Sequence, residues 1–147
     1  MSNFVNLSNT SGRPDGQYNE VINSIKNDGV CPFCPDYLEK YHKNPILTST
    51  ENWLATRNMY PYKNTSQHLL FIHKKHIEDI SEVEQKAWSE LHEITEAVRK
   101  QLNIVGGTLL MRFGDTTRTG ASVSHLHAQL ISGLATDGID PVLARVG

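Results

Sequence analysis

The most constraining feature of this chain is a short stretch near its C-terminal end, residues 120–131. From His125 onward polar and apolar residues alternate, which is the period of a β-strand with one buried face. His125, His127 and Gln129 therefore share one face of the predicted strand. Successive side chains on that face stand roughly 7 Å apart, so they can serve one ligand or two adjacent sites. The alternative interpretation is a solvated face that carries histidines by chance.

Length and charge exclude several classes of protein. The chain has 147 residues, enough for one domain with a buried core, and its 38% hydrophobic and 20% charged residues are typical of soluble globular proteins. A net charge of -2 gives no electrostatic reason to expect a nucleic-acid polymer or an anionic membrane as partner. No apolar run reaches membrane-spanning length, and the first residues lack the features of a secretory signal. We therefore expect a cytoplasmic protein.

The periodicity of the rest of the chain predicts a single α+β domain over residues 17–147, after a flexible N-terminal arm over residues 1–16. Strands are predicted at residues 46–49, 53–57, 68–73 and 108–113, in addition to the one that begins at His125. Because neighbouring strands have short connections, we expect an antiparallel sheet with one long helix packed on it.

Helices and loops are predicted from spacing and from end signals. A short helix ends at Gly29, and helical turns follow over residues 36–43. Residues 81–84, Ser-Glu-Val-Glu, match a capping box that would start a helix of about 20 residues. A loop is predicted at residues 114–119 and an irregular tail at residues 134–147.

Cys31 and Cys34 are the only cysteines, and they lie in the sequence Cys-Pro-Phe-Cys-Pro. This spacing can point both thiolates at one cation, and zinc is favoured if two further ligands exist. A disulfide or a redox pair is the alternative, but no βαβ pattern surrounds the motif. The candidates for the further ligands are His125 and His76, with His42 and His73 as rivals to His76. Four such ligands would close a tetrahedral shell, which is typical of structural zinc.

His127 is then the candidate nucleophile. An imidazole that donates its Nδ1 hydrogen to a backbone carbonyl keeps a lone pair on Nε2, which can attack phosphorus and form a covalent intermediate. The Ser122 hydroxyl and the Gln129 amide would bind the transferred phosphate, and Arg118 would add charge if its loop folds over the site. Otherwise Arg118 is a solvated loop arginine. Because a carboxamide exchanges no proton near neutral pH, the leaving group should already be stable as an anion, as in a phosphoanhydride.

Several motifs resemble those of one superfamily. Residues 125–129, His-Leu-His-Ala-Gln, resemble the active-site signature of the histidine triad (HIT) superfamily, in the form of its galactose-1-phosphate uridylyltransferases and diadenosine tetraphosphate phosphorylases. Gly-Ala-Ser at residues 120–122, the cysteine motif and Arg-Asn-Met-Tyr-Pro at residues 57–61 are similar to the uridylyltransferase version. Residues 68–76 are similar to the strand and basic turn that precede the superfamily's long helix. The resemblance covers residues 30–132 and implies a HIT-like fold.

Carried over residue by residue, the resemblance implies a site and a reaction. It implies structural zinc on Cys31, Cys34, His76 and His125. It implies His127 as nucleophile, Ser122 and Gln129 on the transferred phosphate, and Asn58 near the nucleoside. We therefore expect a nucleotide hydrolase or nucleotidyltransferase that acts on the α-phosphate of a small nucleotide substrate, and we expect a homodimer. The alternatives are a dinucleoside polyphosphate hydrolase or phosphorylase and, in another class, a zinc-stabilised nucleotide-binding module with little turnover.

The chain also departs from the uridylyltransferases. Those enzymes are built from two such domains, whereas this chain has one. Near Gly114, where they have an asparagine on the phosphates, this chain has none, and Gln67 stands where a glycine precedes the strand histidine. The C-terminal tail is short, which argues against a hexose-1-phosphate acceptor.

Overall fold

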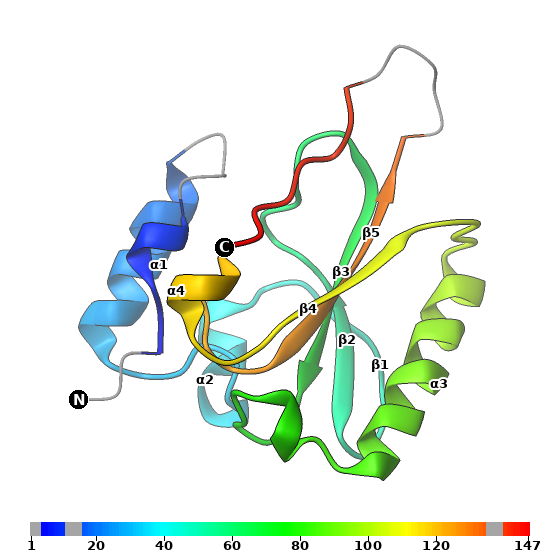
Figure 1. The fold of residues 1–147 in the computed structure, drawn as a ribbon, viewed down its shortest axis with the longest axis horizontal. Coiled ribbons are helices and arrows are strands. Elements are labelled where there is room, and N and C mark those ends of the chain that lie inside the picture. Colours follow the sequence, from blue (N-terminus) through cyan, green and yellow to red (C-terminus); the bar gives the residue numbers. More distant parts are fainter. Residues whose placement is uncertain (1–3, 11–15, 135–139) are drawn as a thin grey trace.

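A five-stranded antiparallel sheet forms the centre of the structure, a computed structural model that describes residues 4–10, 16–134 and 140–147 (Figure 1). Its strand order is β1-β2-β3-β5-β4, and every neighbouring pair is antiparallel. The strands are β1 (Ile46–Ser49), β2 (Trp53–Arg57), β3 (Thr65–His73), β4 (Thr108–Arg112) and β5 (His127–Gly133). The predicted α+β architecture is confirmed.

The long helix α3 (Gln85–Gln101) covers one face of the sheet (Figure 1). Its buried stripe, which includes Leu91, Ile94 and Val98, packs on apolar side chains of β2, β3 and β5 and so forms the main core. Trp53 is fully buried there, and its indole Nε1 donates to the Ala87 carbonyl oxygen at 2.7 Å. Burial of such a stripe supplies most of the free energy that holds a helix on a sheet.

Helix α1 (Gln17–Asp28) lies on the other side of the sheet, with α2 (Pro35–Tyr41) following it (Figure 1). Ile22 and Ile25 of α1 form a second, smaller apolar cluster with Val5 and Val123. As predicted, α1 ends at Gly29, whose positive φ of 67° is accessible to glycine at little cost.

Part of the predicted N-terminal arm packs on the domain. Val5 is buried and pairs with Val123 in an isolated β-bridge, and the Ser124 amide donates to the Phe4 carbonyl oxygen at 3.0 Å. A 3₁₀ turn, η1 (Leu7–Asn9), follows. The other arm residues, 1–3 and 11–15, lie outside the described part of the chain.

The predicted capping box over residues 81–84 is wrong by two positions. Asp79 and Glu82 form the box instead, around the 3₁₀ turn η2 (Ile80–Glu82). The Glu82 carboxylate accepts from the backbone amides of Glu78 and Asp79, so the box caps the turn before α3 and not α3 itself, which begins at Gln85. The cap of α3 is Glu84, with no side-chain hydrogen bond.

Two further boundaries differ from the prediction. Strand β5 begins at His127, two residues later than predicted, because the Leu126 amide donates to the Ile77 carbonyl oxygen, which lies outside the sheet. Residues 114–119 were predicted as a loop, but a short helix, α4 (Thr116–Thr119), forms because the Asp115 side chain accepts from the Thr117 amide. Among the described residues, no helix is long and apolar enough to cross a bilayer. The described tail, residues 140–147, contains no helix or strand.

Candidate active site

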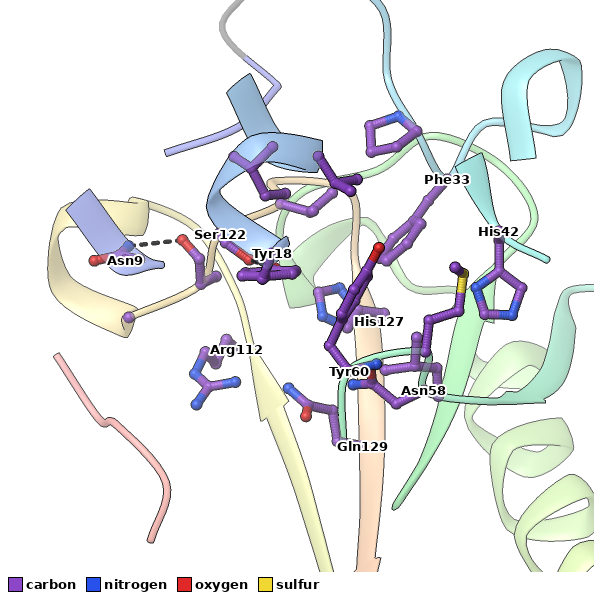
Figure 2. Close-up of a pocket in the computed structure, with 18 of the residues that line it drawn as sticks. Asn9, Tyr18, Phe33, His42, Asn58, Tyr60, Arg112, Ser122, His127 and Gln129 are labelled. Atoms are coloured by element: carbon purple, nitrogen blue, oxygen red, sulfur yellow. Dashed lines mark hydrogen bonds between the residues drawn. The ribbon is translucent and has the colours of Figure 1, made fainter. Parts of the chain in front are cut away.

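A pocket opens on the sheet face that α3 leaves uncovered (Figure 2). Its floor is formed by side chains of β3 and β5, and its walls by α1, by the loop that follows β2, and by residues 120–123. Aromatic rings line much of it, in particular Tyr18, Phe33, Tyr60 and Tyr62. Flat apolar rings beside a few polar groups are typical of pockets that hold small organic ligands.

His127 faces this pocket from the first position of β5 (Figure 2). Its ring Nδ1 lies 2.8 Å from the backbone carbonyl oxygen of His125. Since a carbonyl oxygen can only accept, Nδ1 carries the hydrogen, and the lone pair of the neutral ring is on Nε2. The Phe33 ring packs edge to face on the imidazole, with ring centroids 5.1 Å apart. This is the tautomer that a nucleophilic histidine needs.

Gln129 lies two residues further along β5 and is held by His68 of β3. The Tyr62 backbone amide donates to His68 Nδ1 at 3.0 Å, so the hydrogen of the neutral ring is on Nε2. His68 Nε2 lies 2.6 Å from Gln129 Oε1 and therefore donates to it. The amide oxygen of Gln129 is thus occupied, and its NH₂ group, with two donors, is the end left for a ligand. His68 was not among the predicted site residues.

Asn58 and Ser122, both predicted near the nucleotide, also line the pocket (Figure 2). Asn58 Nδ2 lies 3.3 Å from His68 Nε2, and its Oδ1 accepts from the Tyr60 amide at 2.8 Å. The Ser122 hydroxyl contacts the hydroxyl of Tyr18 on α1. The structure thus brings four of the five predicted catalytic and nucleotide-binding residues to one pocket.

Arg118 is the exception. It is exposed on α4 and lines a neighbouring depression, not the pocket of His127. The arginine that does reach the pocket from this part of the chain is Arg112, the last residue of β4. Sequence patterns could not single it out, because its place depends on how β4 pairs with β5.

The four predicted metal ligands form one cluster beside the pocket. One ligand atom from each of Cys31, Cys34, His76 and His125 lies within 4.8 Å of the others. His125 Nδ1 is 3.3 Å from Cys31 Sγ and 3.2 Å from His76 Nδ1, and Cys34 Sγ is 3.4 Å from His76 Nδ1. A tetrahedral zinc shell has edges of about 3.6 Å between sulfur and nitrogen and about 3.3 Å between nitrogens. The cluster therefore fits such an ion.

The two histidines of this metal cluster are oriented as ligands. His125 Nε2 donates to the His73 carbonyl oxygen at 2.5 Å, and His76 Nε2 lies 3.1 Å from a Glu78 carboxylate oxygen. Each ring therefore carries its hydrogen outside the cluster and turns the Nδ1 lone pair inward, as metal-bound histidines do. Burial raises the pKa of the Cys31 thiol to about 12 and lowers that of His125 to about 4. A divalent cation would supply the positive charge that favours the thiolate.

The rival ligands have other partners. His42 Nε2 lies 2.7 Å from the Thr56 hydroxyl, and His73 Nδ1 lies 2.9 Å from the Lys75 carbonyl oxygen. Neither belongs to the metal cluster.

Comparison with known proteins finds one matching family and several solved structures with a similar fold. The HIT domain family matches residues 40–135. A HIT family hydrolase from Clostridium thermocellum is 26% identical, with 77% of this chain and 96% of that chain covered and a TM-score of 0.55. A Zn-bound histidine triad family protein from Mycobacterium smegmatis is similar at 18% identity, with 78% and 82% covered and a TM-score of 0.58. A histidine triad nucleotide-binding protein from Candida albicans is similar at 18% identity, with 78% and 87% covered and the same TM-score. No curated protein sequence matches significantly.

Proposed function

The chain belongs to the HIT domain family, and from that premise we propose that it transfers the nucleoside monophosphoryl group of a nucleotide to His127 and then to an acceptor. The acceptor is water, phosphate or a sugar phosphate. The observation that carries the proposal is the tautomer of His127: its Nδ1 hydrogen is held by the His125 carbonyl oxygen, and the ring faces an aromatic pocket.

In the first step, the Nε2 lone pair of His127 attacks the α-phosphorus. A nitrogen–phosphorus bond forms and the bond from phosphorus to the bridging oxygen breaks, so the leaving phosphate departs with the electron pair. The Ser122 hydroxyl and the Gln129 NH₂ group bind the non-bridging oxygens, where negative charge builds up.

In the second step, the acceptor oxygen attacks phosphorus from the opposite side. The nitrogen–phosphorus bond breaks and its electron pair returns to His127 Nε2. With water as acceptor, its proton passes to solvent and a nucleoside monophosphate is released. Throughout both steps the His125 carbonyl oxygen keeps the Nδ1 hydrogen in place, so the ring begins and ends the cycle in the same tautomer.

Gln129 restricts the substrate. An amide has no proton to give near neutral pH, so the leaving group must be stable as an anion. Phosphate and polyphosphate satisfy this condition, and an amine does not. We therefore propose a phosphoanhydride substrate, as in dinucleoside polyphosphates or nucleotide sugars, and place the chain in the H-x-H-x-Q branch that includes uridylyltransferases and diadenosine tetraphosphate phosphorylases.

We also propose that zinc occupies the metal cluster, since the spacing and tautomers of the ligands fit it and a similar structure is described as Zn-bound. Two thiolates and two imidazoles fill four positions, so bound zinc would act as a cross-link and not as a water activator. It would fix the loop between Cys31 and Cys34, which carries Phe33 against His127.

We also propose that the protein is a homodimer and that it is cytoplasmic. Within the described chain, β4 pairs only with β5, so its outer edge is open to a second copy. The cytoplasm is supported by Cys31 and Cys34, which form no disulfide and would hold zinc instead, as expected in a reducing compartment.

Intact-mass analysis tests the reaction. The protein is mixed briefly with diadenosine polyphosphates or with nucleotide sugars, and we expect a mass increase of one nucleoside monophosphoryl group. His127→Ala should show none. His92→Ala, which removes an exposed histidine of α3, is the matched control and should form the adduct normally.

Two results would contradict the proposal. An adduct that persists in His127→Ala would mean that another residue is the nucleophile. Nucleotide binding with neither adduct nor turnover would instead indicate the zinc-stabilised binding module.

A further inference from the structure

Arg112 lies directly opposite the proposed nucleophile. In the antiparallel ladder between β4 and β5, Arg112 is the register partner of His127, and Leu110 is the partner of Gln129. Opposed residues in such a ladder place their side chains on the same face of the sheet, with Cβ atoms about 5 Å apart. Arg112 accordingly lines the pocket of His127, and Figure 2 shows it facing the pocket with Gln129 and Ser122.

The guanidinium of Arg112 lacks an anionic partner. Its Nη2 donates to the Tyr62 hydroxyl at 3.3 Å and to the Arg145 carbonyl oxygen at 2.6 Å, both of which are neutral acceptors. Among the residues that the structure describes, no carboxylate forms an ion pair with it. A cation half-buried without a counter-charge is unfavourable, and an anionic ligand would relieve that cost.

One donor of Arg112 has no partner at all. Among buried side-chain nitrogen and oxygen atoms of the described residues, only Arg112 Nε has no hydrogen bond. A buried donor of this kind costs free energy and calls for an explanation such as an absent ion. The nearby Arg145, by contrast, donates from its guanidinium to main-chain oxygens of Ser8 and Gly147.

We propose that Arg112 binds the substrate phosphate adjacent to the one transferred to His127, and so selects substrates with a phosphate in the leaving group. This inference rests on the proposed function and adds the identity of the group that binds the leaving phosphate. The transferred phosphate already has Ser122 and Gln129, whereas the leaving phosphate gains charge as its bond breaks. Since Gln129 cannot protonate it, a fixed cation such as Arg112 would stabilise the leaving phosphate.

The place and the chemistry of Arg112 both suit a phosphate group. Arg112 precedes Gly114 by two residues and reaches the pocket from the end of β4. A guanidinium in this place contributes both a full charge and a fork of donors that matches phosphate oxygens.

The test compares two non-cleavable ligands, a nucleoside monophosphate and its α,β-methylene diphosphate analogue, each with adenine and with uracil. Wild type should bind the diphosphate analogue more tightly by about 10- to 100-fold, as expected for charge-assisted hydrogen bonds. Arg112→Gln should reduce this ratio to within about threefold. Arg112→Lys should give an intermediate ratio, because it keeps the charge and loses the fork.

Controls distinguish a failure of this inference from misfolding of a variant and from a failure of the proposed function. Arg99→Gln, an exposed arginine of α3 that pairs with Glu96, should leave the ratio unchanged, and thermal unfolding verifies that each variant folds. Equal weakening of both ligands in Arg112→Gln would overturn the inference. If Arg112→Gln then still forms the His127 adduct, the proposed function stands without the role proposed for Arg112. Failure of wild type to bind either ligand would contradict both.

Discussion

His68 on β3 donates from Nε2 to Oε1 of Gln129 on β5, with the two atoms 2.6 Å apart. The direction of this bond follows from the other ring nitrogen, which accepts from the Tyr62 amide. An isolated glutamine can turn either end of its amide toward a ligand, and only one end donates. His68 thus sets which end of Gln129 faces the pocket, and we regard it as a positioning residue.

His68→Ala should lower kcat by about tenfold or more, because Gln129 then loses the partner that presents its NH₂ group to the phosphate. Steady-state kinetics on a diadenosine polyphosphate measures the effect. If His68 acts through Gln129, its loss should cost almost nothing in a Gln129→Ala background. Additive losses in the double variant would show that His68 has only a structural role.

Cys31→Ser should abolish binding of about one equivalent of zinc and lower the Tm by several degrees, since metal binding contributes folding free energy. Elemental analysis and thermal unfolding measure the two effects. His42→Asn removes a histidine that contacts Thr56 outside the metal cluster and should keep the metal. Metal loss in His42→Asn, or full retention in Cys31→Ser, would refute the ligand set.

His42 should make the folded state sensitive to mild acid. Burial lowers the pKa of His42 below its ordinary value of 6.5, so the unfolded chain binds a proton that the folded chain resists. The stabilising contribution is therefore complete above pH 6.5 and is lost as the pH falls through the folded pKa. Urea unfolding between pH 7.5 and 5 should give a smaller loss of stability for His42→Asn than for wild type. Equal slopes would contradict this assignment.

Local patterns predicted most of the helices and strands and the cysteine pair, and the family resemblance supplied the two histidines of the metal cluster. Residues 46–49 and 53–57 are strands because their β-branched and aromatic residues suit a pleated surface, and Gly29 ends α1 because a positive φ is required there. The Cys31 and Cys34 pair is similarly local. In each case the decisive interactions lie within a few residues of the chain.

Register was not available from local patterns, and this explains what sequence analysis missed. His68 and Arg112 reach Gln129 and His127 only because β3 and β4 flank β5 in one particular alignment. A shift of one residue would turn either side chain to the other face of the sheet. The capping box failed for a related reason, since two overlapping acidic patterns, at residues 79–82 and 81–84, competed for the same turn.

The pocket also depends on helix α1, which lies outside the family match. That match begins at residue 40. Tyr18 of α1 packs its ring on Tyr60, with centroids 5.1 Å apart, and its hydroxyl contacts that of Ser122. The ring and the hydroxyl should therefore have separable roles, one in holding a nucleoside and the other in orienting a phosphate ligand. Tyr37, exposed on α2 and not among the residues lining the pocket, offers a matched control.

Tyr18→Phe should lower kcat by about three- to tenfold with little change in KM, because it removes the hydroxyl that contacts Ser122 and keeps the ring. Tyr18→Ala should in addition raise KM by about tenfold, because loss of the ring removes the apolar surface and stacking available to the nucleoside. Steady-state kinetics on one nucleotide substrate measures both, and Tyr37→Ala should leave both constants unchanged. If Tyr18→Phe and Tyr18→Ala raise KM equally, the ring does not contact the nucleoside. The specificity of the pocket would then have to come from Phe33 and Tyr60, whose rings also line it.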